Sequence, residues 1–370
     1  MTTHALVVGG GPAGAALATR LAQAGRDVVL VEREAAPTDR VCGEFLSREA
    51  GIYLRSLGVD PDALGAVGID TLRFGEGANV AVTKLPFEAF GLSRRVLDEA
   101  LLARASAAGV AVLRGARAID LTRTDAGFVA RLADGKVLEA EHAFLATGKH
   151  DLRGHRRPEG SQSDLIAFKM HFRLSAAQTR ELRKHVDLAL FDGGYAGLSL
   201  VEEETANLCL LVRRARFDGL EHRWERLLGA IRAESPLLSL RLEGAQARWS
   251  KPLALSKIPY GHLQRETDHL WRLGDQAAVI PSFSGDGMSI ALHSAELAAN
   301  LFLAGQNASA FQRKLARDVA TQMRMATLLS HALVHRSSQR MLGAAARAWP
   351  SLMSAVARST RVSDAALARS

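Results

Sequence analysis

HALVVGGGPAGAALATRLAQAGRDVVLVER, residues 4–33, opens the chain with four features in a fixed order. A short apolar run of strand length ends at Val8, and Gly9, Gly11 and Gly14 follow it with the spacing G-x-G-x-x-G. A run of small residues typical of a closely packed helix comes next, and a second apolar run ends at Glu32. The order strand, glycine turn, helix, strand predicts the start of an α/β fold with a parallel sheet.

Each glycine of this turn has its own task. Gly9 permits the tight turn, Gly11 lets a pyrophosphate approach the backbone, and Gly14 lets the helix pack closely on the strand. Pro12 lies at the start of the helix, where its missing N–H needs no partner. The free N–H groups at this helix N-terminus attract phosphate, and the carboxylate of Glu32 can accept hydrogen bonds from a ribose. We therefore expect a dinucleotide to bind here.

The composition is that of an ordinary globular enzyme, with 48% hydrophobic and 23% charged residues among 370. We recognise no secretion leader and no run of about 18 apolar residues, so we expect no membrane-spanning helix. The two cysteines, Cys42 and Cys209, are too few for a disulfide framework and are typical of a reducing compartment. The expected localisation is cytoplasmic.

Basic residues concentrate in the last part of the chain. Residues 306–370 hold ten Lys and Arg against two Asp, which accounts for the whole formal net charge of +8. Apolar residues recur every three or four positions from 309 to 334 and predict a long amphipathic helix. A solvated helical surface is the favoured interpretation of the charge, and peripheral contact with an anionic membrane is the alternative. No nucleic-acid motif accompanies the charge, so no nucleic-acid partner is expected.

Three later segments narrow the choice of dinucleotide. The pattern R-x-x-L-D begins at Arg94 in a predicted helix, a predicted strand ends in A-T-G at residues 146–148, and GDQAAVIPSFSGDGM spans residues 274–288. In this order they resemble the FAD-dependent superfamily of geranylgeranyl reductases and aromatic hydroxylases of the p-hydroxybenzoate hydroxylase type. The resemblance implies FAD as the cofactor, with Arg94 directed toward it and Asp275 on the ribityl chain. It also places the turn before Met288 beside the flavin ring.

The same resemblance implies the architecture. The fold would be α/β, with a Rossmann-like FAD-binding domain, an interleaved substrate domain built on a mixed sheet, and a helical C-terminus. The FAD-binding domain would be discontinuous, the substrate domain would be inserted into it twice, and the helical region would close the chain. The expected ranges are residues 1–68, 91–158 and 268–305 for the FAD-binding domain, residues 69–90 and 159–267 for the substrate domain, and residues 306–370 for the helical region.

Two branches of this superfamily differ in chemistry. RVCGEFLS, residues 40–47, resembles the Cys-Gly segment of the geranylgeranyl reductases, which lies near the flavin and the substrate cavity. The aromatic hydroxylases carry Asp-Gly where this chain has Thr147 and Gly148. The four tryptophans stand apart and do not form the W-x-W-x-I-P element of the related halogenases.

We interpret the chain as an FAD-dependent oxidoreductase that acts on a bulky hydrophobic substrate such as an isoprenoid, a polyketide or a quinone-like molecule. C=C reduction with NAD(P)H as the reductant is favoured. The alternative is a monooxygenase that hydroxylates an aromatic or polyketide substrate through a flavin C4a-hydroperoxide. The oligomeric state stays open.

The predicted site residues fall into two groups. Cys42 and Glu44 are the candidate catalytic residues, Cys42 on the substrate side of the flavin and Glu44 for proton transfer. No metal-ligand spacing is present, so no metal site is predicted. The predicted cofactor-binding residues are Gly9, Gly11, Pro12, Ala13, Gly14, Glu32, Arg33, Cys42, Gly43, Arg94, Ala118, Gly148, Asp275, Pro281, Gly285, Asp286, Gly287 and Met288.

Other ionisable side chains are candidates for acid–base chemistry, although a lone histidine more often has a structural role. They are Lys169, His171, His185 and His293. We interpret Asp286 as a solvated turn residue beside the flavin and Cys209 as a core residue. The acidic run at residues 202–204 is interpreted as a hairpin turn.

Overall fold

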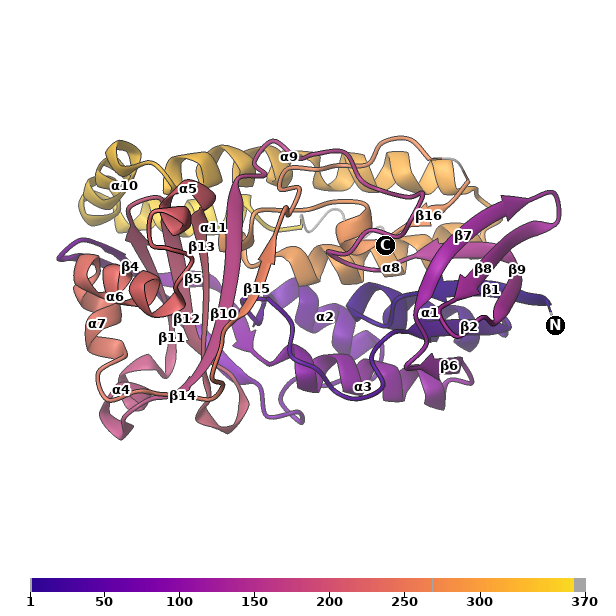
Figure 1. Ribbon diagram of the computed structural model, residues 1–370, viewed down its shortest axis with the longest axis horizontal. Helices are drawn as coiled ribbons and strands as arrows, with labels where there is room; N and C mark the ends of the chain where they lie inside the picture. Colours follow the sequence, from indigo (N-terminus) through magenta and orange to yellow (C-terminus); the bar gives the residue numbers. More distant parts are fainter. Residues whose placement is uncertain (1, 268, 363–370) are drawn as a thin grey trace.

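Figure 1 shows the computed structural model, which describes residues 2–267 and 269–362. Two sheets lie at opposite ends of an elongated molecule, and the long helix α9 (Ala308–Leu333) runs along one side of it. Within the described residues no helix combines the length and the apolar character needed to cross a bilayer.

The first sheet begins with the glycine-rich unit. Its parallel strands β6, β2, β1 and β9 are extended by an antiparallel hairpin of β8 and β7, and β16 pairs with the end of β9 in parallel. Helix α1 packs between α3 and α8 on this sheet. The strands in this order are β6 (Ala111–Arg114), β2 (Val28–Glu32), β1 (Thr2–Val8), β9 (Val137–Leu145), β8 (Gly127–Leu132), β7 (Ala118–Thr124) and β16 (Trp271–Arg272), and the helices are α1 (Pro12–Gln23), α3 (Arg94–Ala107) and α8 (Gly287–Leu303).

The second sheet collects strands from three separate parts of the chain. All its neighbours are antiparallel except β11 and β4, and β15 also pairs with β10. In spatial order the strands are β14 (Gln246–Ala247), β10 (Leu165–Arg173), β13 (Ala206–Arg213), β12 (Gly194–Leu200), β11 (Lys184–Phe191), β4 (Val67–Glu76), β5 (Asn79–Gly91) and β3 (Phe45–Leu46), with β15 (Leu253–Ser256) beside β10.

The two faces of the second sheet have different neighbours because side chains alternate along a strand. On β10, Phe168 and Met170 pack into the cluster that includes residues of α6 and α7, whereas Leu165 and Ala167 pack toward the C-terminal helices. The helices on the first of these faces are α4 (Ala176–Leu182), α5 (Arg214–Asp218), α6 (Trp224–Glu234) and α7 (Pro236–Arg241). Lys169 therefore lies on the face opposite α6.

The remaining elements connect the two sheets. Helix α2 (Arg48–Ser56) follows β3 and packs on α8, and α9 is followed by α10 (Arg336–Ala348) and α11 (Pro350–Ser359). Short 3₁₀ turns lie at Glu202–Glu204, Gly274–Gln276 and Ser282–Ser284.

The expected fold class is confirmed: two mixed sheets are joined by helices, and the chain ends in helices. The long amphipathic helix expected from 309 to 334 is α9, whose apolar positions such as Leu315, Val319 and Met323 are buried. Residues 363–370 of the expected C-terminal region lie outside the described residues.

Candidate active site

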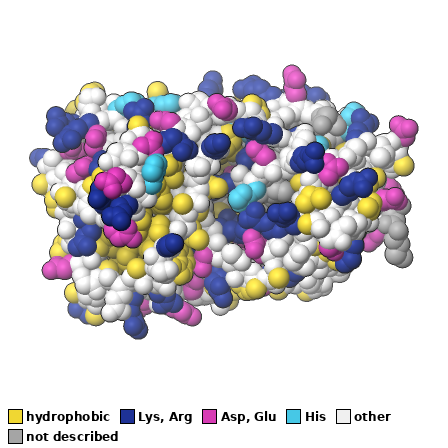
Figure 2. Space-filling model, in the orientation of Figure 1, with side chains coloured by type: hydrophobic (Ala, Val, Ile, Leu, Met, Phe, Trp, Pro, Cys, Tyr) yellow, Lys and Arg dark blue, Asp and Glu magenta, His cyan; other side chains and the backbone are white. Residues whose placement is uncertain are grey.

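A cavity of about 920 Å³ is lined by both sheets and by the C-terminal helices. The segment 40–47 crosses from the first sheet to the second along its wall, since β3 pairs with β5. On the face shown in Figure 2, hydrophobic side chains gather over the second sheet, and Lys and Arg side chains gather near the middle of the molecule. The residues that line the cavity include charged side chains such as Glu32 and Arg94 and apolar side chains such as Leu188 and Leu342.

The glycine turn forms the wall at one end of the cavity. Gly9 has φ +109°, and a Cβ there would lie 2.4 Å from the carbonyl oxygen of Ala146. Gly9, Gly11 and Pro12 line the cavity, and no side chain caps the N-terminus of α1. Free backbone N–H groups at a helix N-terminus are suited to a pyrophosphate, so this end fits the phosphates of FAD.

Glu32 lines the cavity at the end of β2. Its Oε2 accepts a hydrogen bond from the backbone N–H of Gly10 at 2.7 Å, and its Oε1 accepts one from Arg40 at 3.2 Å. The next residue, Arg33, contacts the ring nitrogen Nε2 of His150 at 3.1 Å. The carboxylate is thus held in place at the position expected for a ribose.

Arg94 begins α3 and also lines the cavity. Its guanidinium forms two hydrogen bonds of 2.7 Å to the carboxylate of Asp98, one turn later. A Cβ added to Gly11 would lie 3.3 Å from the Arg94 guanidinium. The R-x-x-L-D pattern therefore produces a fixed positive group beside the glycine turn.

The turns expected beside the ribityl chain and the flavin ring lie on the same wall. Gly148, Asp275, Gly285, Gly287 and Met288 all line the cavity. Lys149 lies 3.8 Å from Asp275. Helix α8 begins at Gly287 without a side-chain cap, so its N-terminal N–H groups are open to a ligand.

Most predicted cofactor-binding residues lie on the cavity wall, including Ala13, Gly43 and Ala118, but Gly14, Pro281 and Asp286 do not. Gly14 has a packing role, because a Cβ there would lie 1.9 Å from the carbonyl oxygen of Gly9.

The structure corrects our interpretation of Asp286 as a solvated turn residue. Asp286 is fully buried, and its carboxylate contacts Arg361 and Gln322 at 3.3 Å each. Burial raises the pKa of Asp286 to about 6, against the opposing charge of Arg361. Sequence reasoning missed this burial because the partners belong to the C-terminal helical region.

The segment Cys42–Gly43–Glu44 lies on the cavity wall between the two sheets. Asn207 of β13 donates hydrogen bonds to the carbonyl oxygens of Cys42 and Gly43, at 3.2 and 2.8 Å. Glu44 has φ 54°, and its backbone N–H contacts the Cys42 sulfur at 3.4 Å. The segment is held in one conformation by the second sheet.

Glu44 is fully buried and receives three hydrogen bonds. Its Oε1 accepts from Lys169 Nζ at 2.5 Å and from the backbone N–H of Arg94 at 2.8 Å, and its Oε2 contacts His171 Nε2 at 2.8 Å. Burial opposes ionisation of this carboxyl, but the His171 hydrogen bond and the Lys169 charge outweigh it, so the pKa of Glu44 lies below its ordinary value. Glu44 is therefore a carboxylate.

Lys169 and His171 come together at Glu44, which the sequence analysis did not anticipate. Both are buried on β10, and the alternation along the strand places them on the same face. The His171 ring stacks on Trp249 at 4.8 Å between centroids, and Lys169 Nζ lies 5.7 Å from the Trp249 ring. Two basic residues within the apolar run of β10, before its last residue Arg173, are the signal that could have identified them.

The other two histidines differ from His171. His185 lies at the start of β11, and its Nδ1 contacts the carbonyl oxygen of Arg183 at 2.6 Å. His293 is buried in α8 and contacts the Tyr53 hydroxyl at 2.8 Å and Asp318 at 3.3 Å. Their partners in these contacts do not line the cavity, whereas Glu44, the partner of His171, does.

The acidic run at Glu202–Glu204 forms the turn between β12 and β13. Glu202 accepts a hydrogen bond from the backbone N–H of Ser93 at 2.8 Å, just before α3. The turn thus fastens the second sheet to the helix that carries Arg94.

The far end of the cavity, which we call the aliphatic chamber, is lined mainly by aliphatic side chains together with the rings of Phe74 and Tyr195. Cys209 is a buried residue on its wall, and burial raises the pKa of its thiol to about 12. Such a thiol behaves as an apolar group. Other lining residues are Leu72, Phe74, Val186, Leu188 and Leu211 from the second sheet and Leu329, Leu333, Leu342, Met353 and Val356 from the C-terminal helices.

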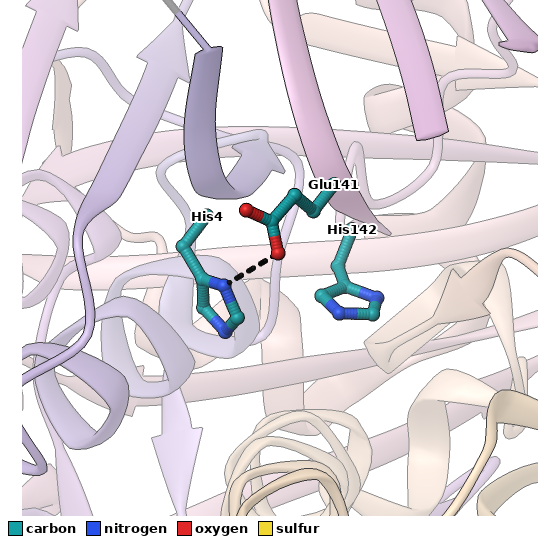
Figure 3. Close-up of side chains that lie close together, drawn as sticks. All are labelled: His4, Glu141 and His142. Carbon is teal, nitrogen blue, oxygen red and sulfur yellow. Dashed lines mark hydrogen bonds and ion pairs between the residues drawn. The ribbon is translucent and has the colours of Figure 1, made fainter. Parts of the chain in front are cut away.

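A separate cluster of His4, Glu141 and His142 joins β1 to β9 (Figure 3). His4 Nδ1 contacts a Glu141 carboxylate oxygen at 3.1 Å, and the Glu141 side chain is 58% exposed. None of the three lines the cavity. We interpret the cluster as a contact between strands.

Residues 2–146 match the protein family described as "FAD binding domain". The chain is 26% identical over 363 residues to menaquinone reductase of Mycolicibacterium smegmatis, covering 89% of this chain and 86% of that protein. It is 24% identical over 312 residues to digeranylgeranylglycerophospholipid reductase 2 of Methanosphaera stadtmanae, covering 79% and 75%. The myxobacterial FAD-dependent halogenase CndH has the same fold, with a TM-score of 0.77 at 20% identity over 97% of this chain and 90% of that one.

Proposed function

We propose that this chain, an FAD-dependent oxidoreductase, reduces a C=C bond in a bulky, hydrophobic, isoprenoid or quinone-like molecule. NAD(P)H is the proposed reductant. The reaction would take place in the cytoplasm, on a substrate drawn from a membrane.

One observation carries this proposal: a single cavity joins the glycine turn to the aliphatic chamber. Gly11 and Glu32 stand at one end, and Leu188 and Leu342 line the other. A polar end suits a dinucleotide, whereas aliphatic walls suit a long hydrocarbon substrate and exclude water. Cys42 and Glu44 lie on the wall near the flavin turns.

The residues present fit FAD. Gly9 and Gly11 leave room for the pyrophosphate at the N-terminus of α1, Glu32 suits the adenosine ribose, and Asp275 suits the ribityl chain. When bound, FAD supplies hydride transfer between the reductant and the substrate. The N-terminal N–H groups of α8 favour negative charge at the neighbouring flavin edge.

Two kinds of relative support the substrate class. The names of these relatives mention menaquinone and digeranylgeranylglycerophospholipid, and both molecules carry long isoprenoid chains. Both relatives are reductases, and each aligns with most of this chain. The aliphatic chamber offers such a chain a matching surface.

The test is a reaction under nitrogen with the FAD-loaded protein, NADPH and menaquinone-4, followed by exposure of the product to air and mass spectrometry. We expect a product that keeps two additional hydrogen atoms after air has reoxidised any quinol, because a reduced C=C bond is stable to air. A product that requires oxygen and gains one oxygen atom would instead establish the monooxygenase alternative.

A further inference from the structure

Four ionisable side chains meet behind the Cys42–Gly43–Glu44 wall. Asp39 lies 3.4 Å from Lys169 Nζ and 4.0 Å from His171 Nδ1, and Glu44 contacts both basic side chains more closely. Asp39 and Glu44 line the cavity, whereas Lys169 and His171 do not. The two carboxylates thus separate the basic groups from the cavity.

The hydrogen bonds define which atoms carry protons. A carboxylate only accepts hydrogen bonds, so the His171 Nε2 facing Glu44 carries a proton. The carboxylates of Asp39 and Glu44 and the ammonium group of Lys169 together leave one negative charge in a buried site. Protonation of His171 Nδ1, which faces Asp39, makes the four groups neutral as a set. Buried charges are tolerated when they are paired in this way.

We propose that Glu44, Lys169 and His171 form the proton source of the reaction in the cavity. Glu44 is the catalytic residue that faces the substrate, and Lys169 and His171 are positioning residues that hold and resupply its proton. This inference rests on the proposed function and names the proton donor that the proposed reduction requires.

The step balances in atoms and charge. His171 first passes the proton on its Nε2 along the 2.8 Å contact to Glu44. One carbon of the C=C bond would receive the hydride that the bound, reduced cofactor supplies, and the other carbon receives this proton from Glu44, so the C=C bond becomes a CH–CH bond and Glu44 is again a carboxylate. Asp39, whose side chain is 19% exposed, connects His171 with solvent.

His171 is held by its charged and aromatic neighbours. The carboxylates of Glu44 and Asp39 lie 2.8 and 4.0 Å from its two ring nitrogens, and the Trp249 ring stacks on it. Lys169 favours the ionised form of Glu44, so a proton passed to Glu44 is readily given up. A cluster that only joined the sheets would not need a carboxylate on the cavity wall.

The first experiment compares His171→Gln, which removes the ring that contacts Glu44, with the control His185→Gln, which removes a ring that contacts the carbonyl oxygen of Arg183. After full reduction by dithionite under nitrogen, product formation from menaquinone-4 is measured in one turnover. We expect His171→Gln to bind FAD normally but to form product about 100-fold more slowly, while His185→Gln keeps the wild-type rate. His171→Gly should regain rate when imidazole is added.

A loss of less than tenfold in His171→Gln, or a His171→Gly variant that imidazole does not rescue, overturns the proposal. Glu44→Gln alone removes the nearer of the two carboxylates that pair with the buried Lys169 and could fail to fold. The double variant Glu44→Gln/Lys169→Met removes both charges, and it should fold, bind FAD and lose product formation as severely as His171→Gln does. A double variant with the wild-type rate also overturns the proposal.

A spectroscopic test separates this inference from the proposed function. In flavin-free protein labelled with ¹⁵N-histidine, the His171 signal, assigned by its loss in His171→Gln, should show two protonated ring nitrogens at pH 7. Asp39→Asn should convert it to one protonated nitrogen, because a negative charge is removed. If the wild-type His171 ring carries only one proton, the proposed proton source is wrong, even if the protein reduces menaquinone. If the ring carries two protons but no menaquinone product forms, the proposed function alone is wrong.

Discussion

Two glycines near the start of the chain occupy positions that leave no room for a side chain. A Cβ at Gly14 would lie 1.9 Å from the carbonyl oxygen of Gly9, and one at Gly9 would lie 2.4 Å from that of Ala146. These contacts set the separation of β1, α1 and the turn after β9. Because the pyrophosphate must approach this backbone, the same absence of side chains serves both packing and binding.

Gly14→Ala tests this steric requirement. We expect it to lower the free energy of unfolding by about 1–3 kcal/mol, as overpacking does, and to lose most of the bound FAD. The control is Gly229→Ala in α6, where a Cβ would meet nothing within 4 Å, and which should gain about 0.5–1 kcal/mol. For both variants, flavin absorbance per protein measures the bound FAD and urea unfolding measures the free energy of unfolding. A fully loaded Gly14→Ala protein of unchanged stability would contradict the prediction.

At the scale of elements, the segment after α11 reaches back to the turn before α8. Arg361 donates a hydrogen bond to the carbonyl oxygen of Ser284 at 2.7 Å and contacts Asp286 at 3.3 Å. Its guanidinium lies 4.6 Å from the Phe87 ring centroid and 5.5 Å from that of Phe45. The end of the described chain thereby holds the turn expected beside the flavin ring.

The buried Asp286 makes the stability of this junction depend on pH. Its folded pKa of about 6 is raised above the ordinary 3.8, so its contribution to stability is fully present below pH 4 and is lost as the pH rises through 6. The loss is at most about 3 kcal/mol, from about 1.4 kcal/mol for each pKa unit. Asp286→Asn should remove this dependence of stability on pH. Urea unfolding of both proteins from pH 4 to pH 7 measures the difference, and parallel pH curves for the two proteins would count against the prediction.

The C-terminal helices expose apolar side chains among many arginines. Leu328 is 67% exposed, Met341 73% and Trp349 65%, and residues 306–370 carry the net positive charge of the chain. Large apolar residues next to basic ones favour the surface of an anionic bilayer. Peripheral membrane contact through these helices stays our proposal.

Flotation of the full chain with vesicles tests this contact. We expect binding to vesicles of phosphatidylglycerol, weaker binding to phosphatidylcholine, and a clear loss in Trp349→Ser, because its indole would enter the interface. Leu240→Ser is the matched control, since Leu240 is 50% exposed on α7, away from the C-terminal helices. Equal binding by Trp349→Ser and the wild type would argue against this surface.

At the scale of the whole molecule, the cavity exists because the two sheets and the C-terminal helices enclose it together. The second sheet draws on β3, on the pair β4 and β5, and on the strands from β10 onward. Each insertion leaves the first sheet and returns to it, so the apolar chamber is held against the cofactor-binding turns. The size of the cavity is therefore decided by the assembly of distant segments.

Gly197→Leu tests the role of the chamber. Gly197 lies on the cavity wall in β12, and the nearest atom to an added Cβ is the Cys209 carbonyl oxygen at 3.8 Å, so a larger side chain can extend into the chamber. We expect normal FAD binding and at least a tenfold increase in KM for menaquinone-4. Gly68→Leu on β4, with nothing within 4 Å of its added Cβ and outside the cavity lining, is the control. An unchanged KM in Gly197→Leu would show that the substrate does not occupy the chamber.

Local sequence patterns were enough to predict the glycine turn, the α/β class, the FAD-binding domain and the long helix α9. These features depend on residues close together in the chain: steric exclusion at Gly9 and Gly14, and the repeat of apolar residues such as Leu315 and Val319 along one helix face. Local spacing is enough for such features, because the interacting groups are neighbours in sequence.

Which ionisable groups meet depends on contacts between segments that are far apart in the sequence. Lys169 reaches Glu44 across 125 residues, and Arg361 reaches Asp286 across 75. Both contacts depend on how the segment 40–47 and the C-terminal region pack against the second sheet and the turn before α8. Burial and charge pairing at that level made Glu44 an ionised carboxylate with a lowered pKa and Asp286 a buried acid with a raised one, a distinction that no local pattern around either residue contains.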